Sequence, residues 1–292
     1  MKLTDISVIR ELLGEEQTSF KKKFGQNFLI NEKVVESIAS SCLPGDIPGE
    51  RVGVIEIGPG IGVLTDKLCG KAGKVVAIEI DRTLIPILEK TLAEHDNRII
   101  INGDVMKVDL NEIVKEHLSG CERVVIAANL PYYITTPIIM MLFESRAPFD
   151  SITVMVQKEV ADRLCAPPGS ELYGAITASV SYFASVKKLF TVPAGNFLPA
   201  PKVDSAVVKF TLHKEPPIAV KDEKTFFRVI KGAFAQRRKT LPNSLSSEFA
   251  HIPRSRLAGI VEEAGIDPRT RGESLGIAEF ARIADLIFDE GR

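Results

Sequence analysis

The stretch VGVIEIGPGIG, residues 52–62, decides the fold of this 292-residue chain. Its first six residues form a largely apolar run without regular alternation, which predicts a strand buried on both faces. Glycines follow at positions 58, 60 and 62, where a backbone without Cβ atoms can turn tightly and approach a ligand. A helix is predicted to begin at Val63. Strand, glycine-rich loop and helix in this order are typical of nucleotide-binding α/β domains.

Similar apolar runs alternate with helical segments on both sides of this stretch. We expect strands at residues 52–57, 74–80, 98–102, 123–128 and 151–156. We expect helical segments at residues 31–41, from residue 63, at 83–92 and at 136–143. This alternation predicts a doubly wound, Rossmann-like α/β sheet that is mostly parallel. Two later runs, SVKKLFTV and KVDSAVVKFTL, flank a proline-rich loop and suggest an antiparallel pair that closes the sheet near one edge.

The chain divides into three predicted parts. Residues 1–30 form an N-terminal segment with a basic run, residues 31–215 the α/β domain, and residues 216–292 a small all-α C-terminal domain. The boundary lies within HKEPPIAV, residues 213–220, which has the composition of a linker. After it only helical periods and turns are visible.

Composition narrows the class of protein. Hydrophobic residues make up 45% and charged residues 26%, as in ordinary globular proteins. The four cysteines are far apart and none has zinc-ligand spacing, so we expect free thiols and no metal. The start of the chain lacks a signal pattern, and no apolar run approaches the roughly 20 residues that cross a bilayer. We therefore expect a cytoplasmic protein without a membrane partner.

The net charge of −1 conceals local basic segments. Lysines are consecutive at 21–23, and residues 224–247 contain no acidic residue. Local patches rather than totals govern affinity for phosphate groups. The candidate RNA contacts are Lys21, Lys22, Lys23, Arg228, Lys231, Arg237, Arg238 and Lys239.

Two acids strengthen the prediction of a nucleoside site. Glu79 lies at the end of the second expected strand, where a carboxylate can accept both hydroxyls of a ribose. Asp104 follows the third strand and can accept a hydrogen bond from an adenine amine. Gly58 and Gly60 would carry the loop beneath the ligand, but Val63 stands where a dinucleotide fingerprint has its third glycine. An NAD-dependent dehydrogenase therefore explains the pattern less well.

The tetrapeptide Asn129-Leu130-Pro131-Tyr132 follows the fourth expected strand. An adenine amine is a poor nucleophile because its lone pair is delocalised into the ring. The Asn129 side-chain oxygen and the Leu130 carbonyl can accept its two N–H groups and aim the lone pair at a methyl donor. Pro131 fixes the backbone, and Tyr132 offers a face on which a flipped base can stack. This tetrapeptide resembles that of amino-methyltransferases, whose donor is S-adenosyl-L-methionine.

The form NLPY resembles the ribosomal RNA adenine dimethyltransferase family in particular, and three further segments agree. KKKFGQNFL, residues 21–29, resembles the family's N-terminal cofactor motif, which implies that Asn27 and Leu29 contact S-adenosylmethionine. GNFLPAPKVDSAVV resembles its late target-base motif, which implies that Phe197 sandwiches the adenine against Tyr132. FFRVIKGAFAQRRKTLPNSL resembles the C-terminal domain of the small-subunit branch. The resemblance runs from Lys21 to about Phe280.

The resemblance implies a specific reaction. The family dimethylates the N6 amines of two adjacent adenosines in the 3′-terminal hairpin loop of 16S rRNA, in the immature 30S subunit during ribosome biogenesis. We expect a monomer that recognises RNA by shape and by splayed-out bases. Two departures from the family pattern do not touch this chemistry: Asn31 stands where an acid is frequent, and Pro242 where arginine is frequent.

Two other readings remain open alongside a dehydrogenase. One is an adenine dimethyltransferase of the antibiotic-resistance branch, which acts on large-subunit RNA, although the long helical C-terminal part disfavours it. The other is a ribosome assembly factor without catalysis, which the intact glycine loop, acids and tetrapeptide disfavour.

Overall fold

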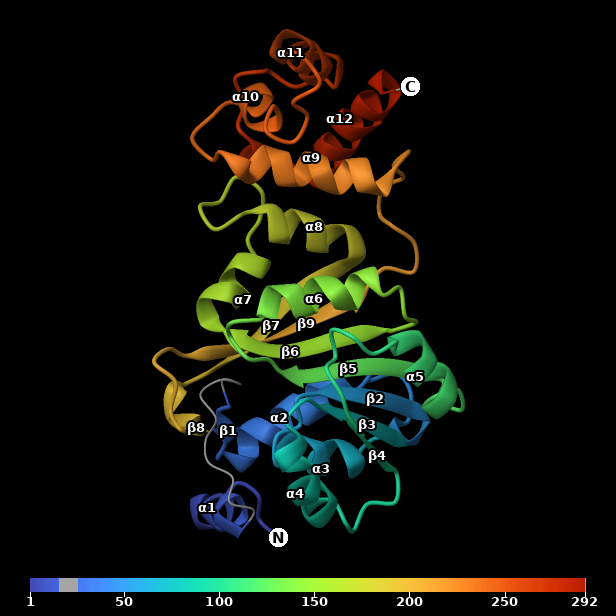
Figure 1. The fold of residues 1–292 in the computed structure, drawn as a ribbon, viewed down its shortest axis with the longest axis vertical. Coiled ribbons are helices and arrows are strands. Elements are labelled where there is room, and N and C mark those ends of the chain that lie inside the picture. Colours follow the sequence, from blue (N-terminus) through green and yellow to red (C-terminus); the bar gives the residue numbers. More distant parts are fainter. Residues whose placement is uncertain (16–25, 292) are drawn as a thin grey trace. The chain divides into compact units, whose positions relative to one another are not determined.

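The structure, a computed structural model, describes residues 1–15 and 26–291 (Figure 1). The chain forms two compact units. The first comprises Met1–Ala161 and Lys187–Leu212, and the second comprises Asp162–Val186 and His213–Arg292. Lys21, Lys22 and Lys23, predicted to contact RNA, lie outside the described residues. The predicted division into residues 1–30, 31–215 and 216–292 by function stays a prediction.

A seven-stranded sheet is the centre of the first unit, in the order β4-β3-β2-β5-β6-β9-β7. Its first five strands are parallel, and β9 runs antiparallel to β6. The fold class predicted from the sequence is therefore confirmed. In chain order the strands are β2 (Val52–Ile57), β3 (Lys74–Glu79), β4 (Arg98–Asn102), β5 (Arg123–Asn129), β6 (Ser151–Gln157), β7 (Ala184–Val192) and β9 (Ser205–Leu212).

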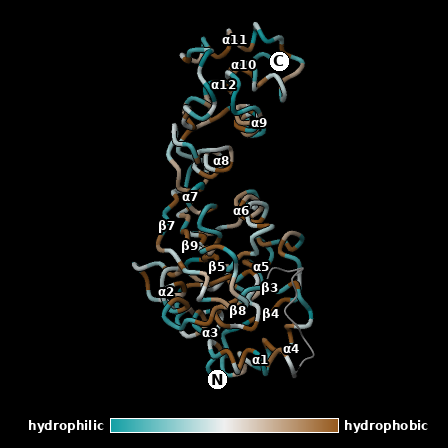
Figure 2. Tube along the Cα trace, turned by 90° about the vertical axis from the view of Figure 1, so that its left-hand side faces the viewer, coloured by the Kyte–Doolittle hydropathy of each residue, from teal (hydrophilic) through white to brown (hydrophobic). Residues whose placement is uncertain are grey.

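Helices connect the strands of this sheet. Every residue of β2 is buried, as expected for a strand covered on both faces, and the hydrophobic stretches of β3 and β5 are brown in Figure 2. The helices are α1 (Ile6–Glu15), α2 (Glu32–Cys42), α3 (Val63–Cys69), α4 (Ile85–Thr91), α5 (Leu110–His117), α6 (Thr135–Glu144) and α7 (Lys158–Leu164), with short 3-10 turns at Gly49–Arg51, Arg82–Leu84 and Ala194–Asn196.

The strand register brings distant segments to one edge of the sheet. Ile57 at the end of β2 lies opposite Ile78 of β3 and Ala128 of β5. The loops that follow these strands therefore leave from the same edge, where open α/β sheets bind their ligands.

A second, two-stranded sheet pairs β1 (Phe28–Leu29) with β8 (Phe197–Leu198). Leu29 lies opposite Phe197 in antiparallel register. Beside this pair, the Ile30 N–H donates to the Asn196 carbonyl at 2.9 Å. The two segments that the resemblance singled out, one early and one late in the chain, are therefore neighbours in the structure.

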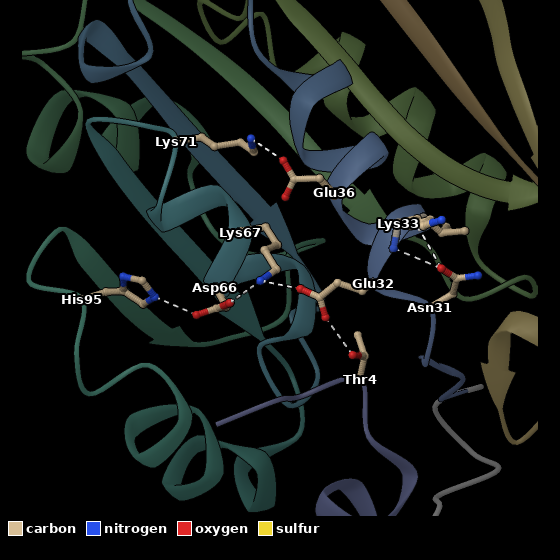
Figure 3. A network of polar contacts seen from close by, with 10 residues as sticks. Thr4, Asn31, Glu32, Lys33, Glu36, Asp66, Lys67, Lys71 and His95 are labelled. Atoms are coloured by element: carbon tan, nitrogen blue, oxygen red, sulfur yellow. Dashed lines mark hydrogen bonds and ion pairs between the residues drawn. The ribbon is translucent and has the colours of Figure 1, made fainter.

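The beginning of the chain is anchored to α2 and α3 by packing and by polar contacts. Ile9 and Leu12 of α1 are buried in the hydrophobic core of the first unit. The Thr4 hydroxyl donates to Glu32 at 2.8 Å, and Glu32 pairs with Lys67 at 2.6 Å (Figure 3). Figure 3 also shows the Asn31 side chain accepting the Lys33 N–H, so the amide that replaces the frequent acid serves as the N-cap of α2.

Apart from the first residues of β7, the described part of the second unit contains helices and turns, as predicted for the C-terminal region. Its core is aromatic: the Tyr182 and Phe226 rings lie 5.0 Å apart, and the Tyr173 hydroxyl donates to the Leu275 carbonyl at 2.9 Å. The helices are α8 (Ala175–Phe183), α9 (Glu223–Ala235), α10 (Leu241–Leu245), α11 (Arg254–Glu263) and α12 (Ile277–Glu290), with a 3-10 turn at Gly272–Ser274. Across the described part of the chain, no helix has both the length and the apolar character needed to cross a membrane.

Candidate active site

The glycine loop between β2 and α3 forms one wall of the site. Gly58, Gly60 and Gly62 all have positive φ angles, of 69°, 64° and 89°. This left-handed region disfavours residues with a Cβ, so the alternate glycines follow from the loop conformation. Gly60 has an additional constraint, because a Cβ there would lie 3.0 Å from the Phe28 ring.

Glu79 supports the loop from the neighbouring strand. Its carboxylate accepts the Gly60 N–H at 3.1 Å and the Asp81 N–H at 2.8 Å. Burial raises the pKa of Glu79 above its usual range, and these backbone N–H groups oppose that rise. Asp81 in turn accepts a hydrogen bond from the Gln26 side chain at 3.2 Å, which ties the segment before β1 to the end of β3.

Glu56 is a second acid, one residue before the end of the buried strand β2. It is 2% exposed, and its Oε2 atom has no hydrogen-bond partner among the described residues. Burial, together with the charge of Glu79, raises the pKa of the Glu56 carboxyl to about 8. An unpartnered buried carboxylate oxygen that lines a pocket suits a cationic or N–H-bearing ligand.

The NLPY tetrapeptide follows β5 at the same edge. The Leu130 N–H donates to the Met155 carbonyl at 3.1 Å, which extends the β5–β6 pairing past Asn129. The Asn129 side-chain N–H donates to the Asn27 carbonyl at 3.2 Å. This bond fixes which end of the amide is oxygen and leaves Oδ1 as an acceptor. Within the described chain no donor is found for Asn129 Oδ1 or for the Leu130 carbonyl.

The two tyrosines of the turn have different surroundings. The Tyr132 hydroxyl lies 2.8 Å from Ser205 Oγ. Burial raises the pKa of the Tyr132 hydroxyl, and the charge of Asp204 acts in the same direction. Tyr133, the next residue, is 65% exposed.

These groups surround one pocket of about 870 Å³, a volume that includes the space at its open mouth. The size falls in the range typical of small-molecule sites. Its lining comes from the glycine loop, the two buried acids, the β1 segment and the tetrapeptide: Gln26, Asn27, Phe28, Leu29, Glu56, Gly58, Pro59, Gly60, Val63, Leu64, Glu79, Ile80, Asn129, Leu130, Pro131, Tyr132 and Tyr133.

Two residues that the sequence assigned to the site lie outside this lining. Asp104 follows β4, where its carboxylate accepts the Met106 N–H at 3.0 Å and lies 3.9 Å from the Lys107 ammonium. Phe197 is only 3% exposed and belongs to the hydrophobic core of the first unit. Its proposed stacking on a target base stays a prediction, as does the adenine contact of Asp104.

The basic residues predicted to bind RNA divide into two groups in the second unit. Arg228 lies 4.6 Å from the centre of the Phe249 ring and donates to the Glu248 carbonyl. Lys231 and Arg237 form ion pairs, with Glu248 at 2.7 Å and Glu273 at 2.9 Å.

Arg238 and Lys239 differ from these three. Both are exposed, and no partner for either side chain is found in the described part of the chain. Their charges are therefore available to an RNA phosphate, whereas those of Arg228, Lys231 and Arg237 are already engaged within the protein.

Sequence reasoning missed Phe28 and Glu56 as site residues. Glu56 carried a signal, since it is the one charged residue in the otherwise apolar run of β2. Phe28 carried none, because its contact with Gly60 depends on the tertiary structure. No cluster of three or more potential metal ligands occurs among residues 1–15 and 26–291.

Comparison with known proteins agrees with this geometry. The family model described as ribosomal RNA adenine dimethylase matches residues 17–289. The ribosomal RNA small subunit methyltransferase A of Lachnoclostridium phytofermentans is 50% identical over 279 residues, covering 95% of this chain and 94% of the relative. The protein of the same name from Streptococcus thermophilus is 47% identical over 293 residues, covering all of both chains.

Solved structures show the same architecture. A dimethyladenosine transferase from Plasmodium falciparum superposes with a TM-score of 0.74 at 26% identity, covering 90% of this chain and 98% of the other. The 23S rRNA methyltransferase ErmE superposes with a TM-score of 0.67 at 23% identity, covering 90% and 100%, and shares the fold. On the length and identity of these matches, the chain belongs to the ribosomal RNA adenine dimethylase family.

Proposed function

We propose that this enzyme transfers methyl groups from S-adenosyl-L-methionine to the N6 amines of two adjacent adenosines in the 3′-terminal hairpin loop of 16S rRNA. Family membership and the names of the full-length relatives support this reaction. The observation that carries it is a pair of acceptors, Asn129 Oδ1 and the Leu130 carbonyl, for which residues 1–15 and 26–291 supply no donor, in the lining of a glycine-lined pocket.

The pocket fits the proposed cofactor on three counts. Gly60 lines the pocket, and a Cβ there would lie 3.0 Å from the ring of Phe28, which lines it too. Glu79 stands at the end of β3, where it can accept ribose hydroxyls. Glu56 has an oxygen without a partner in the described part of the chain, and this oxygen can accept an N–H of the cofactor's amino group. When bound, S-adenosylmethionine supplies an electrophilic methyl group.

The protein's part in the reaction is to position the amine. Asn129 Oδ1 and the Leu130 carbonyl accept the two N–H groups, which directs the nitrogen lone pair away from the ring and toward the pocket. Since the acceptors are fixed by hydrogen bonds to Asn27 and Met155, they require little reorganisation when the amine reacts. The alkylated amine is acidic and loses its proton without a strong base.

The target base must leave its stack to reach this position. Tyr132 provides a stacking face at the pocket, and Phe197 is the proposed second face. Phe197 pairs with Leu29 across the β1–β8 sheet, so it lies close to the pocket-lining segment although it does not itself line the pocket. Its participation requires a side-chain movement when the base enters.

The proposed partner is 16S rRNA within the immature 30S subunit, bound by a monomer in the cytoplasm. Arg238 and Lys239, together with Lys21, Lys22 and Lys23, would contact phosphates. Such contacts hold the RNA in register without reading its sequence, while the loop shape and the extruded adenines supply specificity.

Incubation of unmethylated small and large subunits with enzyme and labelled cofactor tests the proposal. We expect label in 16S rRNA alone. Label confined to 23S rRNA would support the resistance-type reaction instead, and binding without label in either would support an assembly factor without catalysis. Asn129→Ala should abolish labelling. Asn111→Ala is the control and should label as the wild type does, because the Asn111 side chain donates to the carbonyl of Ser145, the residue after α6.

A further inference from the structure

Ser205 occupies the first position of β9, opposite Gln157 of β6. Because β9 runs antiparallel to β6, its first residue lies at the edge where β6 ends and where the tetrapeptide leaves β5. The preceding residue, Asp204, is fixed by two hydrogen bonds. Its carbonyl accepts the Lys158 N–H at 2.9 Å, and its carboxylate accepts the Ala194 N–H at 2.9 Å.

The Ser205 side chain is completely buried, and its Oγ lies 2.8 Å from the Tyr132 hydroxyl. Tyr132 lines the pocket, whereas Ser205 does not. In the described part of the chain, Tyr132 is the partner found for the Ser205 hydroxyl. The serine therefore affects the pocket indirectly, through its hydrogen bond to Tyr132.

We infer that Ser205 is a positioning residue for methyl transfer: its hydroxyl holds the Tyr132 hydroxyl in the pocket wall and thereby fixes the ring on which the target adenine stacks. The inference rests on the proposed function and adds to it a residue that does not touch the substrate.

The hydrogen bond has two consequences for the reaction. It restricts rotation of the Tyr132 side chain, so the stacking face is in place before the base arrives. It also occupies a hydroxyl that can both donate and accept. Without this partner the Tyr132 hydroxyl would have to find another, and the ring would turn with it.

A double-mutant cycle tests the inference on unmethylated small ribosomal subunits. Ser205→Ala should lower kcat by about three- to tenfold, the range expected for one lost hydrogen bond. The affinity for S-adenosylhomocysteine, measured by calorimetry, should stay within about twofold because Ser205 does not line the pocket. In a Tyr132→Phe background, the same serine substitution should change kcat by less than about twofold, since no hydroxyl remains to be held.

Thermal denaturation gives a readout that does not depend on activity. Tyr132→Phe leaves the buried Ser205 hydroxyl without its partner and should lower Tm, and adding Ser205→Ala should recover part of that loss. Ser151→Ala, at a buried serine near the other end of β6, is the matched control and should leave kcat unchanged.

Equal losses of kcat from Ser205→Ala in both backgrounds would mean that the serine acts through strand packing, and this would overturn the inference. An undiminished kcat in Ser205→Ala would overturn it as well. A wild-type protein that leaves the subunits unmethylated would instead count against the proposed function, and the Tm cycle would still report on the hydrogen bond.

Discussion

Substituting Gly60 with alanine should weaken cofactor binding more than any other single methyl group added to the glycine loop. The φ angle of Gly60 is 64°, and this region costs an L-residue about 1–2 kcal/mol. The added Cβ would also lie 3.0 Å from the Phe28 ring, and overpacking of this kind costs about 1–3 kcal/mol. Together the two effects amount to about 2–5 kcal/mol.

Part of this cost should appear in the binding free energy. Without ligand, the loop of Gly60→Ala can relax and Phe28 can move into the pocket. Binding must then restore the original positions of both. Since 1.4 kcal/mol corresponds to about tenfold in affinity, we expect the dissociation constant for S-adenosylhomocysteine to rise by about tenfold or more.

Gly62→Ala is the matched control. Its φ is also positive, at 89°, but its Cβ would meet Thr91, Leu88 and Leu92 instead of a residue that lines the pocket. It should lower Tm while leaving the dissociation constant within a few fold of the wild-type value. Isothermal calorimetry and thermal denaturation separate the two variants. Equal effects of both substitutions on affinity would refute the role assigned to Phe28 and the Gly60 backbone.

Three further outcomes are expected. Burial raises the pKa of Glu56 to about 8 from 4.5, so the folded state holds its proton more tightly than the unfolded state; this contribution to stability is complete below about pH 4.5 and is lost as pH rises toward 8. Glu56→Gln should therefore flatten the decline in the Tm of the unliganded protein across that interval, and an unchanged decline would show that the carboxyl is not responsible. Phe197→Ala should lower the methylation rate by about tenfold or more, because base stacking contributes about 1–3 kcal/mol, while S-adenosylhomocysteine affinity stays near the wild-type value; an undiminished rate would exclude Phe197 as a stacking partner. Replacing Arg238 and Lys239 together by alanine should weaken RNA binding and reduce the slope of log affinity against log salt by about 1–2, and a slope equal to that of the wild type would remove them from the phosphate contacts.

The central sheet could be predicted from the sequence because its signals are local. Apolar runs at residues 52–57 and 98–102 became β2 and β4 with the same bounds. The order of strands and helices was enough to predict the ligand-binding edge, which is the one at the carboxyl ends of the parallel strands. The sequence therefore predicts that the glycine loop and the NLPY tetrapeptide lie at the same edge of the sheet.

What the sequence could not supply depends on contacts between distant residues. β1 and β8 contain two residues each, too few for a sequence pattern. They form because each pairs with the other, although they lie far apart in the sequence. The engagement of Arg228 with the Phe249 ring was equally hidden, since a basic residue on a helix is read as a surface charge until its neighbours are known. The partnership of Tyr132 and Ser205 has the same origin.

Mass spectrometry of 16S rRNA from unmethylated small subunits, after incubation with enzyme and S-adenosylmethionine, tests most directly whether Asn129 and Leu130 hold an adenine amine for methylation. With the wild-type protein we expect two adjacent adenosines that each gain two methyl groups, and with Asn129→Ala we expect neither. Full dimethylation by Asn129→Ala, or methyl groups on positions other than adenine N6, would contradict the proposed chemistry.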